Sequence, residues 1–243
     1  MNILDCPWEL DNLHCRVAEI SVSADEIIDK ELIKELESKY DYLVLKIHAG
    51  RMTNNIIAAE LGFSLAETQM ALIKNKRDWN LENDLLTKRL MEQLSVERIS
   101  TENDFEELMS LITEDMYSTD RIYLDPEFGP KYSMRRYKNW TRTEWERGSL
   151  LYKHFFRGKY VGYSLCKTFG DELVCLLAGC FEQYQKTGIG LWIPLVPELL
   201  PNVQYIKYTT HVSTNNIPVW QMYNHQKYVV GGFDYVFIKH IHH

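Results

Sequence analysis

The stretch LVCLLAGCFEQYQKTGIGLWIPLV (residues 173–196) decides the fold, because it joins an apolar strand, a glycine-containing loop and an apolar helix. The loop carries the pattern Gln-x-x-Gly-x-Gly at Gln185, Gly188 and Gly190, with Lys186 at its rim. Taken alone, this pattern also suits an ordinary turn. Between a strand and a helix, however, free amides and the helix dipole favour an anion, and glycine lets it approach the backbone. The stretch therefore predicts a phosphate-binding loop, without the spacing of a Rossmann or Walker fingerprint.

Strand and helix patterns surround this loop in a definite order. Three apolar segments at residues 150–156, 160–167 and 173–180 are joined by short polar connectors, which predicts an antiparallel meander. After the loop we expect a helix over 188–200, a strand over 203–212, a helix from Asn216 and a last strand over 228–240.

The N-terminal part shows a separate alternation of strands and helices. Strands are expected over residues 14–22, 41–48 and 66–73, with helices opening at the capping box of 23–26 and over 54–61, which makes a β-α-β-α-β unit. Residues 74–95 are charged and helical in character. We therefore predict an N-terminal α/β domain at 1–95 and a second domain at 96–243. The fold class is α/β (α+β mixed sheet) with helices on both faces.

Composition limits the classes of function. The net charge of −7 argues against a nucleic-acid binder, which needs a basic face. Five cysteines without a CxxC pair indicate reduced thiols in a cytoplasmic protein. The acidic start is unlike a signal peptide, and the longest apolar run is too short to cross a membrane. The terminal histidines have no second ligand cluster, so no metal site is expected.

Two motifs in this order resemble the GNAT superfamily of N-acetyltransferases. The first is the loop with Gln185, Gly188 and Gly190. The second, Asn-x-x-Ala-x-x-Leu-Tyr, corresponds here to Asn216, Val219, Met222 and Tyr223. The truncated N-terminal domain narrows the resemblance to the TDP-fucosamine acetyltransferases, which acetylate nucleotide-linked aminodeoxy sugars. The positions that match the narrower family are Arg121, Asp125, Pro126, Tyr137 and Trp140.

The resemblance implies an acetyl-CoA-dependent enzyme in which a small-molecule primary amine, such as that of a nucleotide sugar, attacks the thioester directly. Tyr223 would be the general acid, although it also suits the interior of an amphipathic helix. Asn216 would contact acetyl-CoA or cap its helix, and an amide near Gly179 or Cys180 would stabilise the oxyanion. The pyrophosphate would bind the loop residues Gln185, Lys186, Thr187, Gly188, Ile189 and Gly190.

The acceptor side is less defined by the sequence. The resemblance implies that Arg121, Asp125, Tyr137 and Trp140 contact the acceptor, and Arg135 and Arg136 are further candidates for contact with its diphosphate. Segment 134–147 also suits a solvated amphipathic helix. Candidate bases that would deprotonate the amine are His211, His154 and Asp125.

Departures from the family pattern leave other functions open. Val219 replaces a small alanine, Lys227 stands near a usual Gly-Phe, and Pro194 and Pro197 interrupt the helix after the loop. One alternative is a GNAT enzyme for an amino acid, a polyamine or a protein N-terminus, and another is a non-catalytic acyl-CoA-binding module. The sequence is compatible with a homodimer and leaves the acceptor and the acyl length open.

Overall fold

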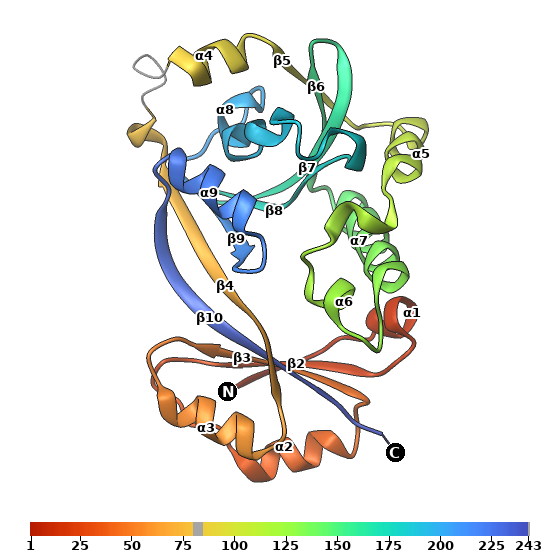
Figure 1. The fold of residues 1–243 in the computed structure, drawn as a ribbon, viewed down its shortest axis with the longest axis vertical. Helices are drawn as coiled ribbons and strands as arrows, with labels where there is room; N and C mark the ends of the chain where they lie inside the picture. Colours follow the sequence, from red (N-terminus) through yellow and green to blue (C-terminus); the bar gives the residue numbers. More distant parts are fainter. Residues whose placement is uncertain (80–84, 243) are drawn as a thin grey trace.

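The computed structural model describes residues 1–79 and 85–242. Its centre is one mixed sheet in the order β1-β2-β3-β10-β4-β9-β8-β7-β6-β5 (Figure 1). The strands are β1 (Asn2–Asp5), β2 (Val17–Val22), β3 (Tyr42–His48), β4 (Ser64–Asn75), β5 (Leu94–Arg98), β6 (Leu150–Phe156), β7 (Lys159–Phe169), β8 (Glu172–Cys180), β9 (Lys207–Ser213) and β10 (Val229–His240). The predicted class, a mixed α/β sheet, is confirmed, and β6, β7 and β8 form the expected antiparallel meander.

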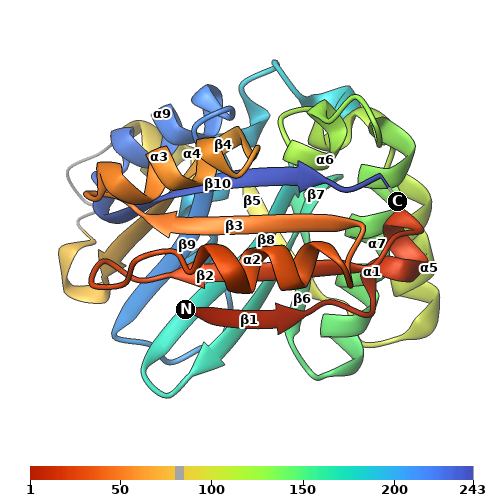
Figure 2. The ribbon, with the colours of Figure 1, turned by 90° about the horizontal axis from the view of Figure 1, so that it is seen from below.

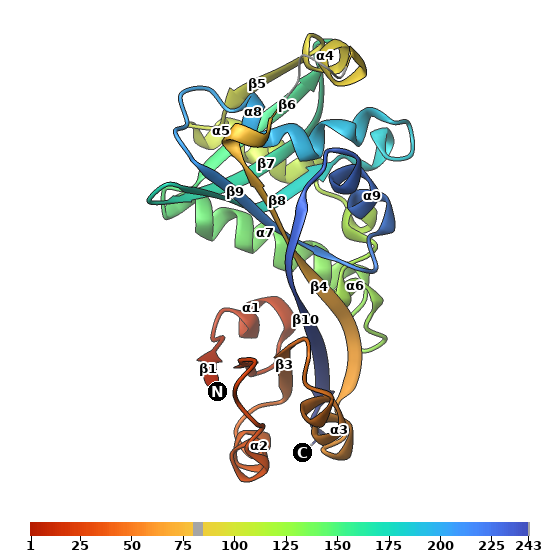
Figure 3. The same cartoon turned by 90° about the vertical axis from the view of Figure 1, so that its left-hand side faces the viewer.

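Two long strands join the N-terminal and C-terminal parts of the sheet. Both β4 and β10 extend from the upper part of the molecule to the lower part (Figure 3). Strand β10 lies between β3 and β4 and pairs antiparallel with both (Figure 2). The expected parallel pair β2-β3 is present, but β4 does not continue the unit beside β3, because the C-terminal strand occupies that position. A boundary at residue 95 stays a prediction.

Helices cover both faces of this sheet. The α-helices are α1 (Glu9–Leu13), α2 (Lys30–Glu37), α3 (Met52–Glu60), α4 (Leu85–Met91), α5 (Glu102–Leu111), α6 (Arg121–Leu124), α7 (Pro130–Glu146), α8 (Val196–Leu199) and α9 (Ile217–His225). Only half of the predicted capping box forms: the Ser23 amide donates to the Glu26 carboxylate, but the Ser23 hydroxyl donates to the same carboxylate, and the Glu26 amide bonds the Ser23 carbonyl. Helix α2 begins later, after the cap Asp29. No helix in the described ranges is long and apolar enough to cross a membrane.

The predicted continuous helix over 188–200 is wrong. Residues Ile189–Leu195 form a 3₁₀-helix, which is followed by the single turn of α8. Pro194 has no amide to donate inside the first segment, and Pro197 stands at the start of the second, where its missing amide is tolerated. The two prolines therefore divide one expected helix into two short ones.

Alternating side chains divide the upper core into two layers. In β6, Leu151 packs under α5 and α7, whereas its neighbour Tyr152 packs on the opposite face with Trp192 and Tyr223. In the lower part, α2 and α3 cover one face, while α1 and α6 cover the other. We call the face of the sheet that is covered by α6 and α7 the α6/α7 face. It includes β6, β7 and β8 in the upper part and β2, β3 and β10 in the lower part.

Candidate active site

The parallel strands β8 and β9 open into a gap. They pair only over Glu172–Cys175 and Lys207–Thr210, although β8 continues to Cys180 and β9 to Ser213. A bulge at Leu176 interrupts the pairing of β8 with β7 at the same level, because Leu165 faces Leu177 and Cys166 faces Cys175. An extra residue bends the bulged strand and increases its twist. The bulge therefore turns the end of β8 away from β9.

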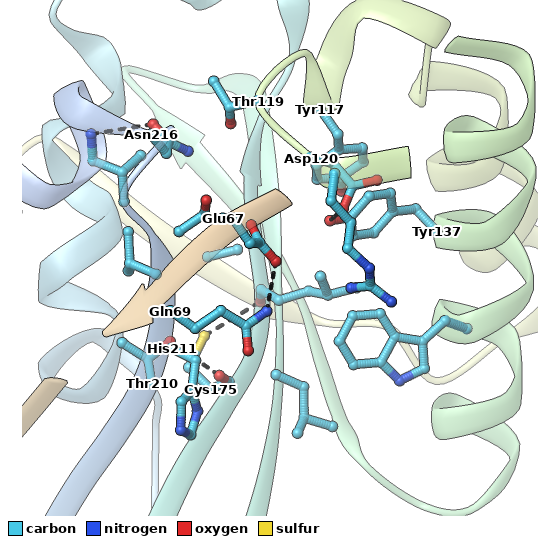
Figure 4. A pocket seen from close by; sticks show the side chains of 18 of the residues that line it. Glu67, Gln69, Tyr117, Thr119, Asp120, Tyr137, Cys175, Thr210, His211 and Asn216 are labelled. Atoms are coloured by element: carbon cyan, nitrogen blue, oxygen red, sulfur yellow. Dashed lines mark hydrogen bonds between the residues drawn. The ribbon is translucent and has the colours of Figure 1, made fainter. Parts of the chain in front are cut away.

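A cavity of about 520 Å³ passes through this gap. On the α9 face it is lined by Ile193, Asn216, Val219 and Tyr223, and the wall of the gap is made by residues 174–178 and 210–213. On the α6/α7 face the lining residues are Glu19, Lys46, Glu67, Gln69, Tyr117, Thr119, Asp120, Arg121, Arg136, Tyr137, Trp140 and Asp234. Figure 4 shows that side chains from the sheet and from the α6/α7 segment face each other across it.

Backbone amides at the end of β8 point into the gap. The Phe181 amide donates to the Val161 carbonyl at 3.0 Å, which fixes the alternation of the antiparallel β7-β8 pair. By that alternation the amides of Ala178 and Cys180 point away from β7, whereas the Gly179 amide points toward it. The Cys180 carbonyl also points away, because it accepts from Gln185 Nε2 at 3.1 Å. The amides of Ala178, which lines the cavity, and of Cys180 at the end of β8 thus point toward the gap.

Tyr223 and Asn216 lie on the α9 side of the cavity. Tyr223 is buried, and burial raises its pKa, with a further contribution from Cys175. Its phenol therefore stays protonated at neutral pH. Asn216 lines the cavity and also caps α9, since its Oδ1 accepts from the Val219 amide at 3.3 Å. Both roles considered for Asn216 are thus compatible with its position.

The glycine loop lies beside the end of β8. Gly188 has φ +83°, and a Cβ added to Gly190 would lie 3.8 Å from the Cβ of Cys180. The amides of Lys186, Thr187 and Gly188 have no hydrogen-bond acceptor among the described residues, whereas Ile189 N donates to Thr187 Oγ1. Three successive free donors next to a lysine suit an anion. The Gln185 side chain serves the fold, by bonding the Met116 and Cys180 carbonyls.

The structure brings three of the four predicted acceptor residues to the cavity. Arg121, Tyr137 and Trp140 line it, and Tyr137 stacks on Tyr117 with ring centroids 3.8 Å apart. Asp125 is not a lining residue. Its carboxylate is buried elsewhere, where it accepts from His240 Nε2 at 2.9 Å.

Only one of the three candidate bases reaches the cavity. His211 lines it and is accessible to solvent; partial burial and Lys46 lower its pKa, so its imidazole is neutral at pH 7. His154 is completely buried, stacks on Trp192 and bonds Ser164 Oγ at 2.7 Å. Burial lowers the pKa of His154 to about 3.

The sequence patterns did not indicate four polar residues on the sheet, which accompany the candidate base His211. Glu67 and Gln69 on β4, Asp234 on β10 and Lys46 on β3 lie on the same face as His211 on β9, the face covered by α6 and α7. Alternating polar residues in AETQMALI were a possible signal, but the segment also suits a strand with one solvated face. No group of three or more His, Cys, Asp or Glu side chains suited to a metal occurs in residues 1–79 and 85–242.

Solved structures share the fold of this chain at low sequence identity. A functionally unknown conserved protein from Staphylococcus epidermidis superposes with a TM-score of 0.63 and 14% identity, covering 93% of this chain and 84% of the other. A GCN5-related N-acetyltransferase (GNAT) from Kribbella flavida gives 0.57 and 10%, covering 92% and 81%. The enzyme of that class from Sphaerobacter thermophilus gives 0.57 and 12%, covering 83% of this chain and 60% of the other.

The chain has the GNAT fold. No protein-family model and no curated protein matches its sequence. In this chain, the cavity that lies at the gap between β8 and β9 is lined by residues from both faces of the sheet.

Proposed function

We propose that the protein is an N-acetyltransferase that transfers acetyl from acetyl-CoA to the primary amine of a small molecule. One observation carries the proposal: a single cavity crosses the sheet at the β8/β9 gap, with a protonated phenol on one face and polar groups on the other. The backbone edges of the separated strands can pair with the amide groups of a pantetheine arm. The thioester would then lie between Tyr223 and His211.

The free amides of the glycine loop are our proposed site for the pyrophosphate of acetyl-CoA. Lys186, Thr187 and Gly188 offer three donors without internal acceptors, and Ile189 and Gly190 begin the 3₁₀-helix that follows. The positive charge of Lys186 adds to this anion site. Cys180 and Asn216, at the edges of the gap, complete our proposed contacts with acetyl-CoA.

The proposed reaction is direct attack in a complex that holds both substrates. His211 accepts a proton from the acceptor ammonium, and the neutral amine attacks the thioester carbon, forming the C–N bond. The oxyanion is stabilised by the amides of Ala178 and Cys180. The C–S bond then breaks, Tyr223 protonates the leaving thiolate, and the nitrogen loses its second proton to solvent.

For the acceptor, our finer proposal is a nucleotide-linked aminodeoxy sugar. Tyr137 and Trp140 offer aromatic surfaces for a ring, and Arg121 offers charge for a diphosphate. Asp125 would act only indirectly, through the turn that follows α6.

Thiol release from acetyl-CoA tests the proposal. The acceptor panel contains TDP- and UDP-linked amino sugars, amino acids and polyamines, and a separate titration measures acetyl-CoA binding. We expect binding of acetyl-CoA and turnover with at least one primary amine. Absence of acetyl-CoA binding would overturn the proposal; binding without turnover by any amine would instead favour an acyl-CoA-binding module.

A further inference from the structure

The charged side chains around the cavity differ in whether they already have a partner. Four of them belong to three pairs: Lys46 with Glu19 at 2.7 Å, Arg136 with Glu9 at 2.7 Å, and Asp234 with His48 at 3.1 Å. Asp120 accepts hydrogen bonds from the Ile122 amide, Ser133 and Tyr137. Within the described part of the chain, Glu67 and Arg121 form no ion pair.

Glu67 is a buried carboxylate with spare hydrogen-bonding capacity. Its side chain comes from β4, the residue is only 6% exposed, and it accepts one hydrogen bond, from Gln69 Nε2 at 2.8 Å (Figure 4). A carboxylate has about four acceptor positions. A buried charge without a partner is unfavourable in a folded protein unless a ligand completes it. An ammonium group would supply Glu67 with both a positive charge and hydrogen-bond donors.

Arg121, from α6, is a cation that lacks an anionic partner among the described residues. Its Nε is buried without an acceptor, and the guanidinium forms no ion pair with any described carboxylate; its polar neighbour is the Tyr42 side chain, which carries no charge at neutral pH. Burial lowers the pKa of Arg121, but Tyr42, Asp120, Glu67 and Glu19 together raise it by more, so the guanidinium stays charged. Glu67 and Arg121 both line the cavity, and no ion pair joins them in the described residues. A guanidinium matches a carboxylate or a phosphate, which can accept two of its donors.

We propose that the acceptor carries an anionic group as well as its primary amine, with the ammonium held by Glu67 and the carboxylate or phosphate by Arg121. This inference rests on the proposed N-acetyltransferase function. A polyamine would satisfy Glu67 but bring a second cation toward Arg121. A simple alkyl amine would leave Arg121 without an anionic partner.

Pairs of acceptors that differ only in the anionic group measure its contribution separately from that of the amine. The pairs are 4-aminobutyrate with butylamine, 3-aminopropyl phosphate with 3-aminopropanol, and a TDP-linked amino sugar with its methyl glycoside; 1,4-diaminobutane is the dication. Products are identified by mass after incubation with acetyl-CoA. We expect at least one anionic member to exceed its counterpart at least about tenfold in kcat/KM. The pair with this preference shows whether Arg121 binds a carboxylate or a phosphate.

Variants of Arg121 and Glu67 test whether these two residues cause the preference for an anionic amine. Arg121→Gln should abolish the preference for the anionic member, and Glu67→Gln should raise KM for the amine about tenfold or more with a smaller change in kcat. Glu67→Asp should recover part of this loss. Arg142→Gln is the matched control, because Arg142 also lies on α7's side of the sheet but is paired with Glu102 and Glu106.

Acetyl-CoA affinity, measured for every variant, reports folding and the cofactor site independently of the acceptor. The inference is overturned if no anionic amine is acetylated by a protein that binds acetyl-CoA. It is also overturned if Arg121→Gln keeps the full anionic preference, or if uncharged counterparts react as well as the anionic members. Failure to bind acetyl-CoA would instead overturn the underlying function.

Discussion

The two sides of the cavity are built differently. The side proposed for acetyl-CoA comes from one continuous part of the chain, from β8 to α9, with the glycine loop beside it, and it offers mainly backbone donors and neutral side chains. The acceptor side is assembled from β2, β3, β4, β10, α6 and α7, and it offers mainly charges. The difference implies that changes on the first side should affect every acceptor, while changes on the second should affect acceptor choice.

Tyr223→Phe should have the largest effect. Removal of the phenol leaves the departing thiolate without its acid, so we expect kcat to fall about 100-fold with every acceptor. Acetyl-CoA affinity should change little, because the ring remains. Steady-state kinetics and a binding titration measure the two quantities. Tyr228→Phe is the control, since that hydroxyl bonds Pro194 O in the same core; equal losses in both variants would make Tyr223 structural.

Gly188→Val should weaken acetyl-CoA binding by about tenfold or more. Gly188 has φ +83°, which a β-branched residue tolerates poorly, and its side chain would crowd the proposed pyrophosphate site. Gly170→Val controls for backbone strain, because Gly170 has φ +56° and equally open surroundings in the β7-β8 turn. A titration with acetyl-CoA should show loss only in the Gly188 variant. Unchanged affinity there would remove the loop assignment.

The same contrast explains what the sequence could predict. The β6-β7-β8 meander depends on local patterns within some tens of residues, and local sequence predicted it, whereas the helix expected over 188–200 is divided by its two prolines. The insertion of β10 between β3 and β4 joins segments far apart in the chain, so no local pattern encodes it. The facing of Glu67 and Arg121 depends on that insertion. Resemblance indicated Arg121, Tyr137 and Trp140, but burial and pairing were needed to separate Asp125 from them.

His211→Gln tests whether His211, at the gap between the two sides of the cavity, deprotonates the acceptor amine. The pKa of His211 is lowered, so its neutral form persists below the ordinary histidine pKa of about 6.5. In the wild type, kcat/KM should therefore rise with pH along an acidic limb below pH 6.5, as the imidazolium loses its proton. The variant should lose this limb and about tenfold in rate. His225→Gln, at an exposed position on α9, should keep it. An unchanged limb in the His211 variant would assign it to another group.

Cys175→Ala should have the smallest effect, and it separates direct attack from an acyl-enzyme route. Cys175 lines the cavity, and its hydrogen bond with Cys166 lowers its pKa, which are the properties of a nucleophile. Its thiol, however, bonds the Leu177 carbonyl at 3.3 Å and thereby spans the bulge. Direct attack predicts kcat within about threefold of wild type, and Cys166→Ala as control should behave alike. Loss of turnover in Cys175→Ala alone, with an acetylated Cys175 in the wild type, would instead show that the acetyl group passes through this thiol.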